Sequence, residues 1–547
     1  MFQTRIFKAK KIITMNPNQP ETTHVAVRNG RILGTGTLEE LEIWGDYSLD
    51  NTFHNKILMP GLVEGHAHVM AGTLWRHVYC GYFDRVDPDG NMWQGTKTIS
   101  GVIELLQATE SKLKDPEQAL SGWQFDPIYM DNKRMTRGDL DEVSAKRPVG
   151  VLHASGHVLN ANSKALELAG LLKLGINHPG IPLGQDGLPT GELYGPDAMG
   201  AVSIHVGFDR ASMEGDAEGL RAFGKICVRS GVTTITDLAA RLTEESVVKM
   251  LEVTEHPAYP ARIVPLRIFM GASAEDTMDL VLSLKERSTD RLRLGRIKAV
   301  ADGSIQGFSA RMRWPGYFNG APNGLWYTLP EQLGKLYRLA LANGVQVHTH
   351  TNGDEATEMA LDTLAPALND FPIVDHRFTL QHCQLADEAQ FRRMKNMEMC
   401  VNLFSNHQFY WGDEHYRLTV GPERANRMNA CSTALKMGVP MAIHSDAPIT
   451  PLGPLFTAWC AVNRLTFSGR VQGESEKISV QDALYAITLG AAYTLHLDGE
   501  IGSIEVGKKA DFAVLEQDPT KIGGENLKKI EIWGTVQGGR IFAAENL

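Results

Sequence analysis

The feature that most restricts the fold of this 547-residue chain is a repeated alternation of apolar, β-branched segments with helical patterns. Such alternation is typical of parallel strands joined by crossover helices. We identify eight candidate strands, at residues 61–68, 231–238, 262–270, 296–303, 344–350, 377–383, 399–404 and 439–446. Eight strand and helix units predict an α/β protein with a closed (β/α)8 TIM barrel.

The spacing of these strands is uneven at one place. About 160 residues separate the first candidate strand from the second, far more than a usual crossover connection. We therefore predict an insertion with its own secondary structure over about residues 70–228, and we assign the strand-like segment 147–157 to it. A loop that follows a barrel strand lies over the active-site face, so the insertion is expected to form a lid or a pocket wall.

The two ends of the chain share one hairpin style. Asn29-Gly30 near the start and Gly538-Gly539 near the end each lie between short alternating segments. Such pairs favour the tight turns of β-hairpins. The ends either form one sheet domain together or are two unrelated terminal hairpins.

The net charge and the hydropathy of the chain indicate which kinds of binding partner are not expected. The formal net charge of −10 and the pI near 6.0 offer no basic surface for a phosphate backbone, so a nucleic-acid partner is not expected. No stretch approaches the ~20 consecutive apolar residues of a membrane span, and the first residues lack a signal-peptide core. We expect a cytoplasmic protein that acts on a small molecule, with no membrane partner.

The first candidate strand ends in the pair His66 and His68. Residues two apart on a strand point to the same side, about 7 Å apart along the chain. Both imidazoles can therefore reach one cation. An H-x-H pair on its own is weak evidence, because chance also produces it.

Further metal-binding side chains stand at the carboxyl ends of later candidate strands: Lys298, His350, His382 and Asp446. Barrel enzymes assemble their active sites from these strand ends. Imidazole and carboxylate suit divalent metals such as zinc, and an open coordination position admits water. Each residue also has a structural alternative. His382 would be a core histidine, Asp446 a helix cap and Lys298 a solvent-exposed side chain.

Several motifs give a more specific resemblance. They are MPGLVEGHAH, GHVLNANSKALELAG, GLPTGELYG, GVTTITD, IKAVADGSIQG, VHTHTNGDEA, LQHCQ, IHSDAPITPLGP and IGSIEVGKKADFAVLEQDP. With them the chain resembles the amidohydrolase superfamily, and within it the N-acyl and N-formyl amide hydrolases of amidohydrolase family three. The motifs run over nearly the whole chain.

The resemblance implies an architecture. It is a distorted (β/α)8 TIM barrel over residues 59–497, with the large insertion after barrel strand one, and a β-sandwich domain made of residues 1–58 and 498–547. A homodimer is an expectation at the level of the family only.

The resemblance also implies a catalytic centre with one or two divalent ions, zinc by preference. His66, His68 and Asp446 would hold one ion, and His350 and His382 a second.

Three further roles follow from the resemblance. Lys298 would bridge the ions as an N6-carboxylated lysine, which requires a neutral, buried amine. Asp446 would take a proton from water and pass it to the leaving amine. His157 would contact the substrate as an oxyanion donor. The alternative for His157 is a structural histidine in a loop.

Substrate contacts are expected from residues near the predicted site. His348 and His444 each lie two residues from a candidate ligand, where they would orient substrate or support a ligand, and a small residue is more usual at position 444. Trp75 and Phe308 would line an apolar or aromatic pocket, or else pack the loops. Arg311 and Arg313 are candidates to receive a substrate carboxylate.

These features together predict metal-dependent hydrolysis of a non-peptide carbon–nitrogen bond. The substrate would be a small, apolar or aromatic amide, N-acyl or N-formyl compound. The alternatives are a deaminase, an esterase or a carbon–carbon bond lyase on the same metal site, or a barrel that serves as a non-catalytic scaffold.

Overall fold

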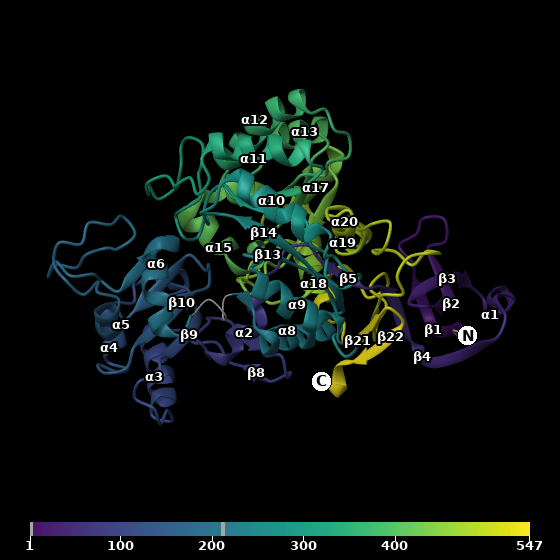
Figure 1. The fold of residues 1–547 in the computed structure, drawn as a ribbon, viewed down its shortest axis with the longest axis horizontal. Helices are drawn as coiled ribbons and strands as arrows, with labels where there is room; N and C mark the ends of the chain where they lie inside the picture. The colour runs from purple at the N-terminus through teal and green to yellow at the C-terminus, as the bar shows by residue number, and fades with distance from the viewer. Residues whose placement is uncertain (1–3, 209–213) are drawn as a thin grey trace. The chain divides into compact units, whose positions relative to one another are not determined.

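A computed structural model describes residues 4–208 and 214–547, and its centre is an eight-stranded parallel sheet (Figure 1). Each predicted barrel segment overlaps one of its strands. In spatial order these are β5 (Leu62–Glu64), β13 (Val232–Ala240), β14 (Arg262–Phe269), β15 (Ile297–Val300), β16 (Val347–Thr351), β17 (Thr379–His382), β18 (Cys400–Leu403) and β19 (Met441–Ile443). The order in space follows the order along the chain, which confirms a TIM-barrel-like α/β fold.

The first and last strands of this sheet meet just beyond their carboxyl ends. A parallel bridge joins Ala67 to Ala447, and the His68 amide donates to the Ala447 carbonyl at 2.7 Å. The two chain segments that carry His66, His68 and Asp446 are therefore held side by side by their backbones.

Helices connect the strands of the barrel. They include α9 (Glu244–Glu255), α10 (Ala274–Lys285), α11 (Pro330–Ala342), α12 (Asp354–Asp370), α13 (Glu388–Asn396), α17 (Cys431–Lys436), α18 (Pro454–Asn463), α19 (Val480–Ala486) and α20 (Leu489–Tyr493). Helix α11 begins with a proline and buries Leu333, Leu336 and Tyr337 on one face. The chain leaves it through Gly344 with φ 61°, a left-handed conformation that glycine adopts without strain. Helix α11 is thus one of the crossover helices that the alternating pattern predicts.

Strands from both ends of the chain form a second, seven-stranded sheet, seen in Figure 1 where purple and yellow strands meet. Its order is β22 (Arg540–Ala543), β21 (Ile532–Gln537), β20 (Phe512–Leu515), β4 (Tyr47–Pro60), β1 (Thr4–Ile13), β2 (Glu21–Arg28) and β3 (Arg31–Gly36). Strands β4 and β20 pair antiparallel, from Pro60 against Phe512 to Ile57 against Leu515. The two terminal hairpins are therefore parts of one sheet.

The turns of these hairpins have the conformation that their sequences favour. Asn29 and Gly30 have φ of 54° and 73°, and Gly538 and Gly539 have φ of 57° and 79°. Two successive left-handed residues match the right-handed twist of the flanking strands. The sheet belongs to the same compact unit as the barrel, residues 1–68 with 224–547. A separate β-sandwich domain of residues 1–58 and 498–547 stays a prediction.

The remaining compact unit is Val69–Phe223. It contains a five-stranded sheet in the order β12 (Glu192–Tyr194), β11 (Val158–Ala161), β10 (Val149–His153), β9 (Leu120–Phe125) and β6 (Val78–Tyr79). Side chains of its strands, such as Trp123, Leu152 and Leu193, are buried in one hydrophobic cluster. Strand β10 lies within the segment 147–157 that the sequence assigned to the insertion. A role for this unit as a lid stays a prediction.

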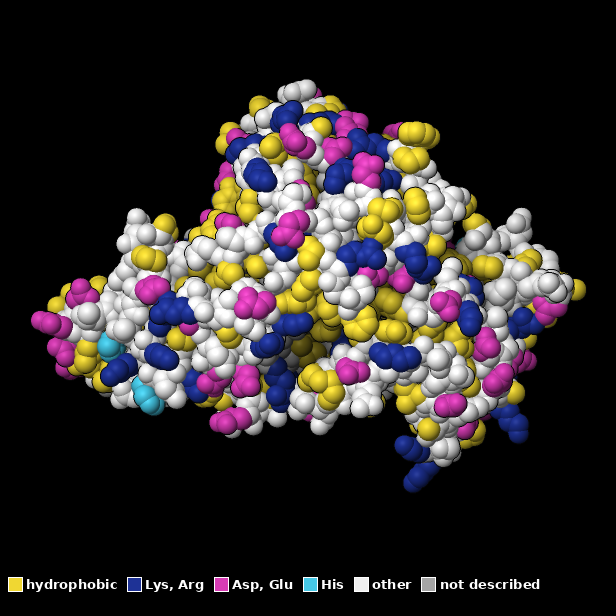
Figure 2. All heavy atoms as spheres, turned by 180° about the vertical axis from the view of Figure 1, so that it is seen from behind, with side chains coloured by type: hydrophobic (Ala, Val, Ile, Leu, Met, Phe, Trp, Pro, Cys, Tyr) yellow, Lys and Arg dark blue, Asp and Glu magenta, His cyan; other side chains and the backbone are white. Residues whose placement is uncertain are grey.

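Two properties of the surface and the helices bear on partners. On the face drawn in Figure 2, Lys and Arg side chains are interspersed with Asp and Glu side chains. Within residues 4–208 and 214–547, none of the helices combines the length and the hydropathy needed to cross a lipid bilayer.

Candidate metal centre

The parallel sheet brings the predicted ligands to one edge. His66 and His68 follow β5, His382 ends β17, and Asp446 follows β19. One carboxylate oxygen of Asp446, Oδ1, lies 3.4 Å from His66 Nε2 and 3.1 Å from His68 Nε2. The other, Oδ2, lies 3.9 Å from His382 Nδ1. Residues separated by more than 300 positions in the sequence thus converge on one carboxylate.

His66, His68 and Asp446 form a candidate metal site, because one ligand atom from each lies within 4.8 Å of the others. Two imidazoles and a carboxylate are a donor set that zinc and similar divalent metals accept. The His68 Nδ1 atom is buried and has no hydrogen-bond partner among the described residues. The residues present therefore fit a divalent metal ion.

Glu64, a residue that the sequence pattern did not indicate, forms hydrogen bonds with the segments that carry these ligands. Its carboxylate accepts hydrogen bonds from the Ser445 amide at 3.1 Å, the Ser445 hydroxyl at 2.8 Å and the His66 amide at 3.3 Å. Burial raises the pKa of Glu64 to about 8, against the effect of these hydrogen bonds. Glu64 therefore ties the segment before Asp446 to the segment that carries His66. The sequence feature that could have identified Glu64 is an acidic residue directly after the apolar pair Leu62-Val63 in a strand with both neighbours buried.

A chain of hydrogen bonds fixes the ring of His66. Its Nδ1 lies 2.8 Å from Gln381 Oε1, which also accepts from Asn402 Nδ2 at 3.0 Å. Gln381 Nε2 lies 2.7 Å from His348 Nδ1, and His348 Nε2 lies 3.0 Å from the Thr494 carbonyl. An amide oxygen and a carbonyl only accept, so His66 donates from Nδ1 and His348 from Nε2. This leaves the His66 Nε2 lone pair directed at the metal centre.

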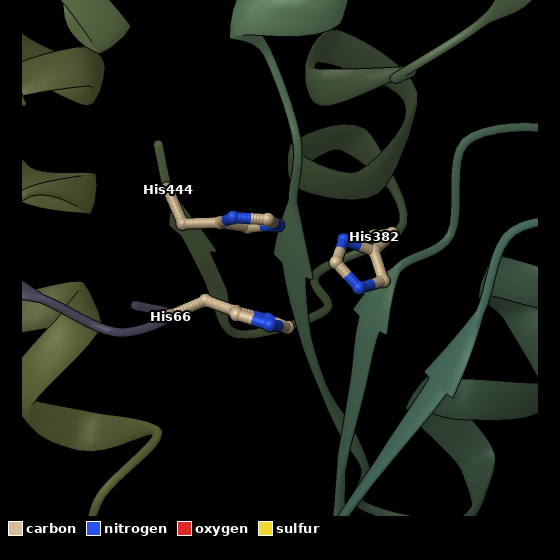
Figure 3. Close-up of side chains that lie close together, drawn as sticks. All are labelled: His66, His382 and His444. Carbon is tan, nitrogen blue, oxygen red and sulfur yellow. The ribbon is translucent and has the colours of Figure 1, made fainter. Parts of the chain in front are cut away.

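A second group of three ligand atoms within 4.8 Å of one another comes from His66, His382 and His444 (Figure 3). The rings of His66 and His444 are stacked, with centroids 4.6 Å apart and planes 20° apart. The His382 ring lies 4.5 Å from the first and 5.0 Å from the second. In Figure 3 both stacked rings extend toward His382. His444 thus lies among the predicted ligands.

His350 is near this cluster but is turned toward other groups. Its ring centroid is 4.4 Å from that of His382. Its Nε2 atom, however, lies 3.2 Å from the Gly303 carbonyl, 3.0 Å from Asn352 Nδ2 and 3.6 Å from Asp302 Oδ1. In the described part of the chain, His350 and His382 are not members of a common three-ligand group.

Lys298 is buried on β15, and its Nζ atom has no hydrogen-bond partner within the described residues. Burial lowers the pKa of Lys298 to about 7, while the nearby Asp446 carboxylate acts in the opposite direction. A substantial fraction of this amine is therefore neutral at neutral pH, as carbamate formation requires.

The protonation states of the other candidate ligands also suit a metal. Burial, followed by repulsion from neighbouring cationic groups, lowers the pKa of His66 and of His382 well below the usual value. Burial acts to raise the pKa of Asp446, but hydrogen bonding to His68 and the charges of His68, His444 and Lys298 bring it below its usual value. Neutral imidazoles and an ionised carboxylate are the forms that coordinate metals.

Three residues that were predicted to contact substrate have other neighbours in the structure. Phe308 packs in an apolar cluster with its ring 5.2 Å from that of Tyr317. Trp75 and His157 belong to the Val69–Phe223 unit. The Trp75 ring there lies 5.2 Å from that of Trp123, and the His157 carbonyl accepts a hydrogen bond from the Gly195 amide at 3.1 Å.

The two arginines considered as carboxylate receptors are engaged by acidic side chains of this chain. Arg311 donates to Glu355 at 2.8 Å. Arg313 forms ion pairs with Asp354 and Asp387. Their charges are thus already balanced within the protein.

Comparison with known proteins gives matches over nearly the whole chain. The model of the amidohydrolase family designated Amidohydro_3 matches residues 54–543. The protein LONG AFTER FAR-RED 3 of Arabidopsis thaliana is 29% identical over 524 residues, which cover 92% of this chain and 85% of that protein. The N-substituted formamide deformylase of Arthrobacter pascens is 25% identical over 537 residues, 94% of each chain.

Solved structures show the same fold. An uncharacterized metal-dependent hydrolase from Pyrococcus horikoshii OT3 superposes with a TM-score of 0.71 at 19% identity, over 95% of this chain and 99% of that one. The family match covers most of the sequence and includes every residue of the candidate metal centre. This chain therefore belongs to the amidohydrolase family and is a metal-dependent hydrolase with a TIM-barrel-like fold.

Proposed function

We propose that this enzyme hydrolyses a non-peptide carbon–nitrogen bond in a small amide, of the N-acyl or N-formyl type. The observation that carries the proposal is the convergence of His66 and His68 on Asp446 Oδ1, at 3.4 and 3.1 Å. A relative that covers 94% of the chain is named as a formamide deformylase, which supports this bond type.

His66, His68 and Asp446 would hold a divalent metal ion, with zinc as the best match to the donor set. Such an ion supplies Lewis-acid chemistry, because it activates water at neutral pH and polarises the substrate carbonyl. Lys298, His382 and His350 would serve a second ion. The neutral fraction of the Lys298 amine supports a carbamate at that position.

Asp446 is the proposed acid and base. Its carboxylate is ionised, and Oδ2 is the oxygen farther from His66 and His68, so it is available to take the proton of the attacking water. The same carboxyl group then donates that proton to the nitrogen of the leaving amine. Without this transfer the amine would depart as an unstable anion, so the residue affects bond cleavage more than binding.

Two buried residues would keep the catalytic side chains in position for this reaction. Gln381 orients His66, and Glu64 positions the backbone next to Asp446 through Ser445. His348, with both ring nitrogens in hydrogen bonds, supports Gln381 in this arrangement. Substrate contacts are assigned to Phe308, to Trp75 as a pocket wall and to His157 as an oxyanion donor.

The test is a screen of zinc-loaded protein against amides that differ in acyl group and amine, with products identified by mass spectrometry. We expect release of an amine together with formate or another acid from at least one class. Ammonia release from a ring, ester cleavage without amide cleavage, or carbon–carbon cleavage would each replace the proposal with one of its alternatives. Fully metallated protein without any turnover would favour a non-catalytic scaffold.

A further inference from the structure

The ring of His444 is buried in the candidate metal centre, and no hydrogen bond within the described residues explains why a polar ring occupies this position. It follows β19 directly and is fully buried between two other rings. His66 stacks on one side at 4.6 Å, and Phe404 stacks on the other at 4.7 Å with planes 25° apart. An apolar side chain would fill this slot without burying polar atoms.

Both ring nitrogens of His444 are buried without a hydrogen-bond partner among the residues that the structure describes. His348 and His407, which are buried nearby, have hydrogen-bond partners, whereas Nδ1 of His68 and Nδ1 of His382 also lack one among the described residues. His348 bonds to Gln381 and Thr494, and His407 Nδ1 lies 2.9 Å from His415 Nε2. Buried polar atoms in native proteins nearly always have partners, so the two unpaired nitrogens of His444 require an explanation, and a bound ion is one.

The position of His444 relative to two other imidazoles indicates which kind of ligand. One nitrogen from each of His66, His382 and His444 lies within 4.8 Å of the others, and both stacked rings extend toward His382 (Figure 3). On His66 the free lone pair is on Nε2, because Nδ1 donates to Gln381, so Nε2 is the atom that would bind an ion. Three imidazoles with an open fourth position are a complete protein contribution to a catalytic zinc site.

We propose that His444 is a metal ligand, which completes a three-imidazole zinc site with His66 and His382. This site shares His66 Nε2 with the group formed by His66, His68 and Asp446. A single nitrogen lone pair binds one ion, so the two groups are overlapping positions of one ion. In this arrangement His382 serves the same ion as His66, and it does not serve a second ion with Lys298 and His350. The inference rests on the proposed metal dependence of the chain, and it is independent of the substrate.

The overlap has a consequence for Asp446. An ion in the three-imidazole position leaves the Asp446 carboxylate free of coordination, and hence available for proton transfer. An ion in the other position uses Asp446 as a ligand. His444 would therefore favour the form of the centre in which Asp446 acts on the proton.

The direct test is anomalous diffraction from crystals of the zinc-loaded wild-type protein. We expect one nitrogen of His444 at about 2.0–2.1 Å from the ion, the usual zinc–imidazole distance. A His444 ring whose nitrogens both lie more than about 3 Å from every zinc ion would overturn the proposal, because that exceeds any coordination bond.

A second measurement uses His444→Phe, which keeps the aromatic stack, with His407→Phe as the matched control. X-ray absorption of the zinc-loaded proteins should count one imidazole fewer per ion in H444F than in wild type or in H407F. Zinc affinity in H444F should fall by at least about 10-fold, since even indirect support of a ligand carries that effect. An unchanged imidazole count, or the same loss in both variants, would refute the assignment.

The result is separable from the proposed function. Asp446→Asn removes the acid and base but leaves the three imidazoles. Loss of turnover in D446N with His444 still bound to zinc supports both ideas. Bound His444 in an enzyme that cleaves no amide supports the ligand and rejects the function, and the converse result rejects the ligand alone.

Discussion

His66 Nδ1 and Gln381 Oε1 form a hydrogen bond of 2.8 Å between residues 315 positions apart in the sequence. It determines which nitrogen of His66 faces the metal centre, because the amide oxygen can only accept. Asn402 and His348 hold the Gln381 amide in the orientation that makes this possible. The ring orientation of a candidate metal ligand is therefore set by a residue of β17, a strand that is not adjacent to β5 in the sheet.

Gln381→Leu is expected to lower zinc affinity by about 10- to 100-fold, the usual effect of removing the group that orients a ligand histidine. Competition with a chromophoric chelator measures this affinity. Gln472→Leu is the matched control, since Gln472 is also buried but donates to the Ala425 carbonyl away from these ligands. Equal zinc affinity in wild type and Q381L would show that His66 needs no such support.

Asp446→Asn is expected to lower kcat/KM by about 100- to 10,000-fold, the range for loss of a general acid or base. The imidazoles that remain should keep zinc bound, so elemental analysis is expected to give a metal content near that of wild type. Retained turnover in D446N would remove the proton-transfer role from this residue.

Lys298 is expected to carry a carbamate, observable by 13C NMR after incubation with labelled bicarbonate. The signal should increase from pH 6 to pH 8, because the pKa of Lys298 is about 7 and only the neutral amine reacts with carbon dioxide. Lys298→Met should abolish the signal.

Lys11→Met provides the control for that experiment. Burial acts to lower the pKa of Lys11, but hydrogen bonds to Glu21 and Asp518 raise it above the usual value. Lys11 thus stays protonated and unreactive, and its removal should leave the signal unchanged. A signal that survives in K298M but disappears in K11M would contradict the assignment.

The ion pair between Arg262 and Asp511 is expected to be important for stability. The two groups lie 2.8 Å apart with side chains only 2% and 3% exposed. Arg262→Met should cost about 3–5 kcal/mol of unfolding free energy, because it leaves a buried carboxylate unpaired.

Adding Asp511→Asn to that variant should recover part of the loss, since the amide is neutral and its oxygen can still accept from the Gly538 amide. Chemical denaturation of the three proteins measures both effects. A double variant less stable than the single one would mean that the unpaired charge is not the cause.

His153 is expected to make the Val69–Phe223 unit sensitive to acid. Burial lowers the pKa of His153 to about 3, against the hydrogen bond with Asn160. The unfolded chain takes up a proton near pH 6.5 that the folded chain does not, so stability falls as the pH decreases from about 6 to 4. His153→Gln should reduce the slope of the unfolding free energy against pH by about 1.4 kcal/mol per pH unit, which corresponds to one proton. Denaturation curves at several pH values test it, and an unchanged slope would disprove it.

The sequence by itself determined the barrel and the place of its candidate ligands. Periods of apolar residues define strands and helices locally, and parallel strands necessarily gather their carboxyl ends at one edge. The positions of His66, His68, His382 and Asp446 at or just beyond the carboxyl ends of their strands were sufficient to predict that they meet. The turns at Asn29-Gly30 and Gly538-Gly539 could also be predicted from the sequence, because their conformation depends only on these residues.

Only the tertiary structure decided which atoms face each other. It placed His382 with His66 and His444, and it turned His350 Nε2 toward the Gly303 carbonyl. It also supplied the bond from His66 to Gln381. These relationships depend on ring orientations and on contacts between strands far apart in sequence. Local periodicity carries no information about either, because it fixes the face of a strand on which a side chain lies but not the partner it meets.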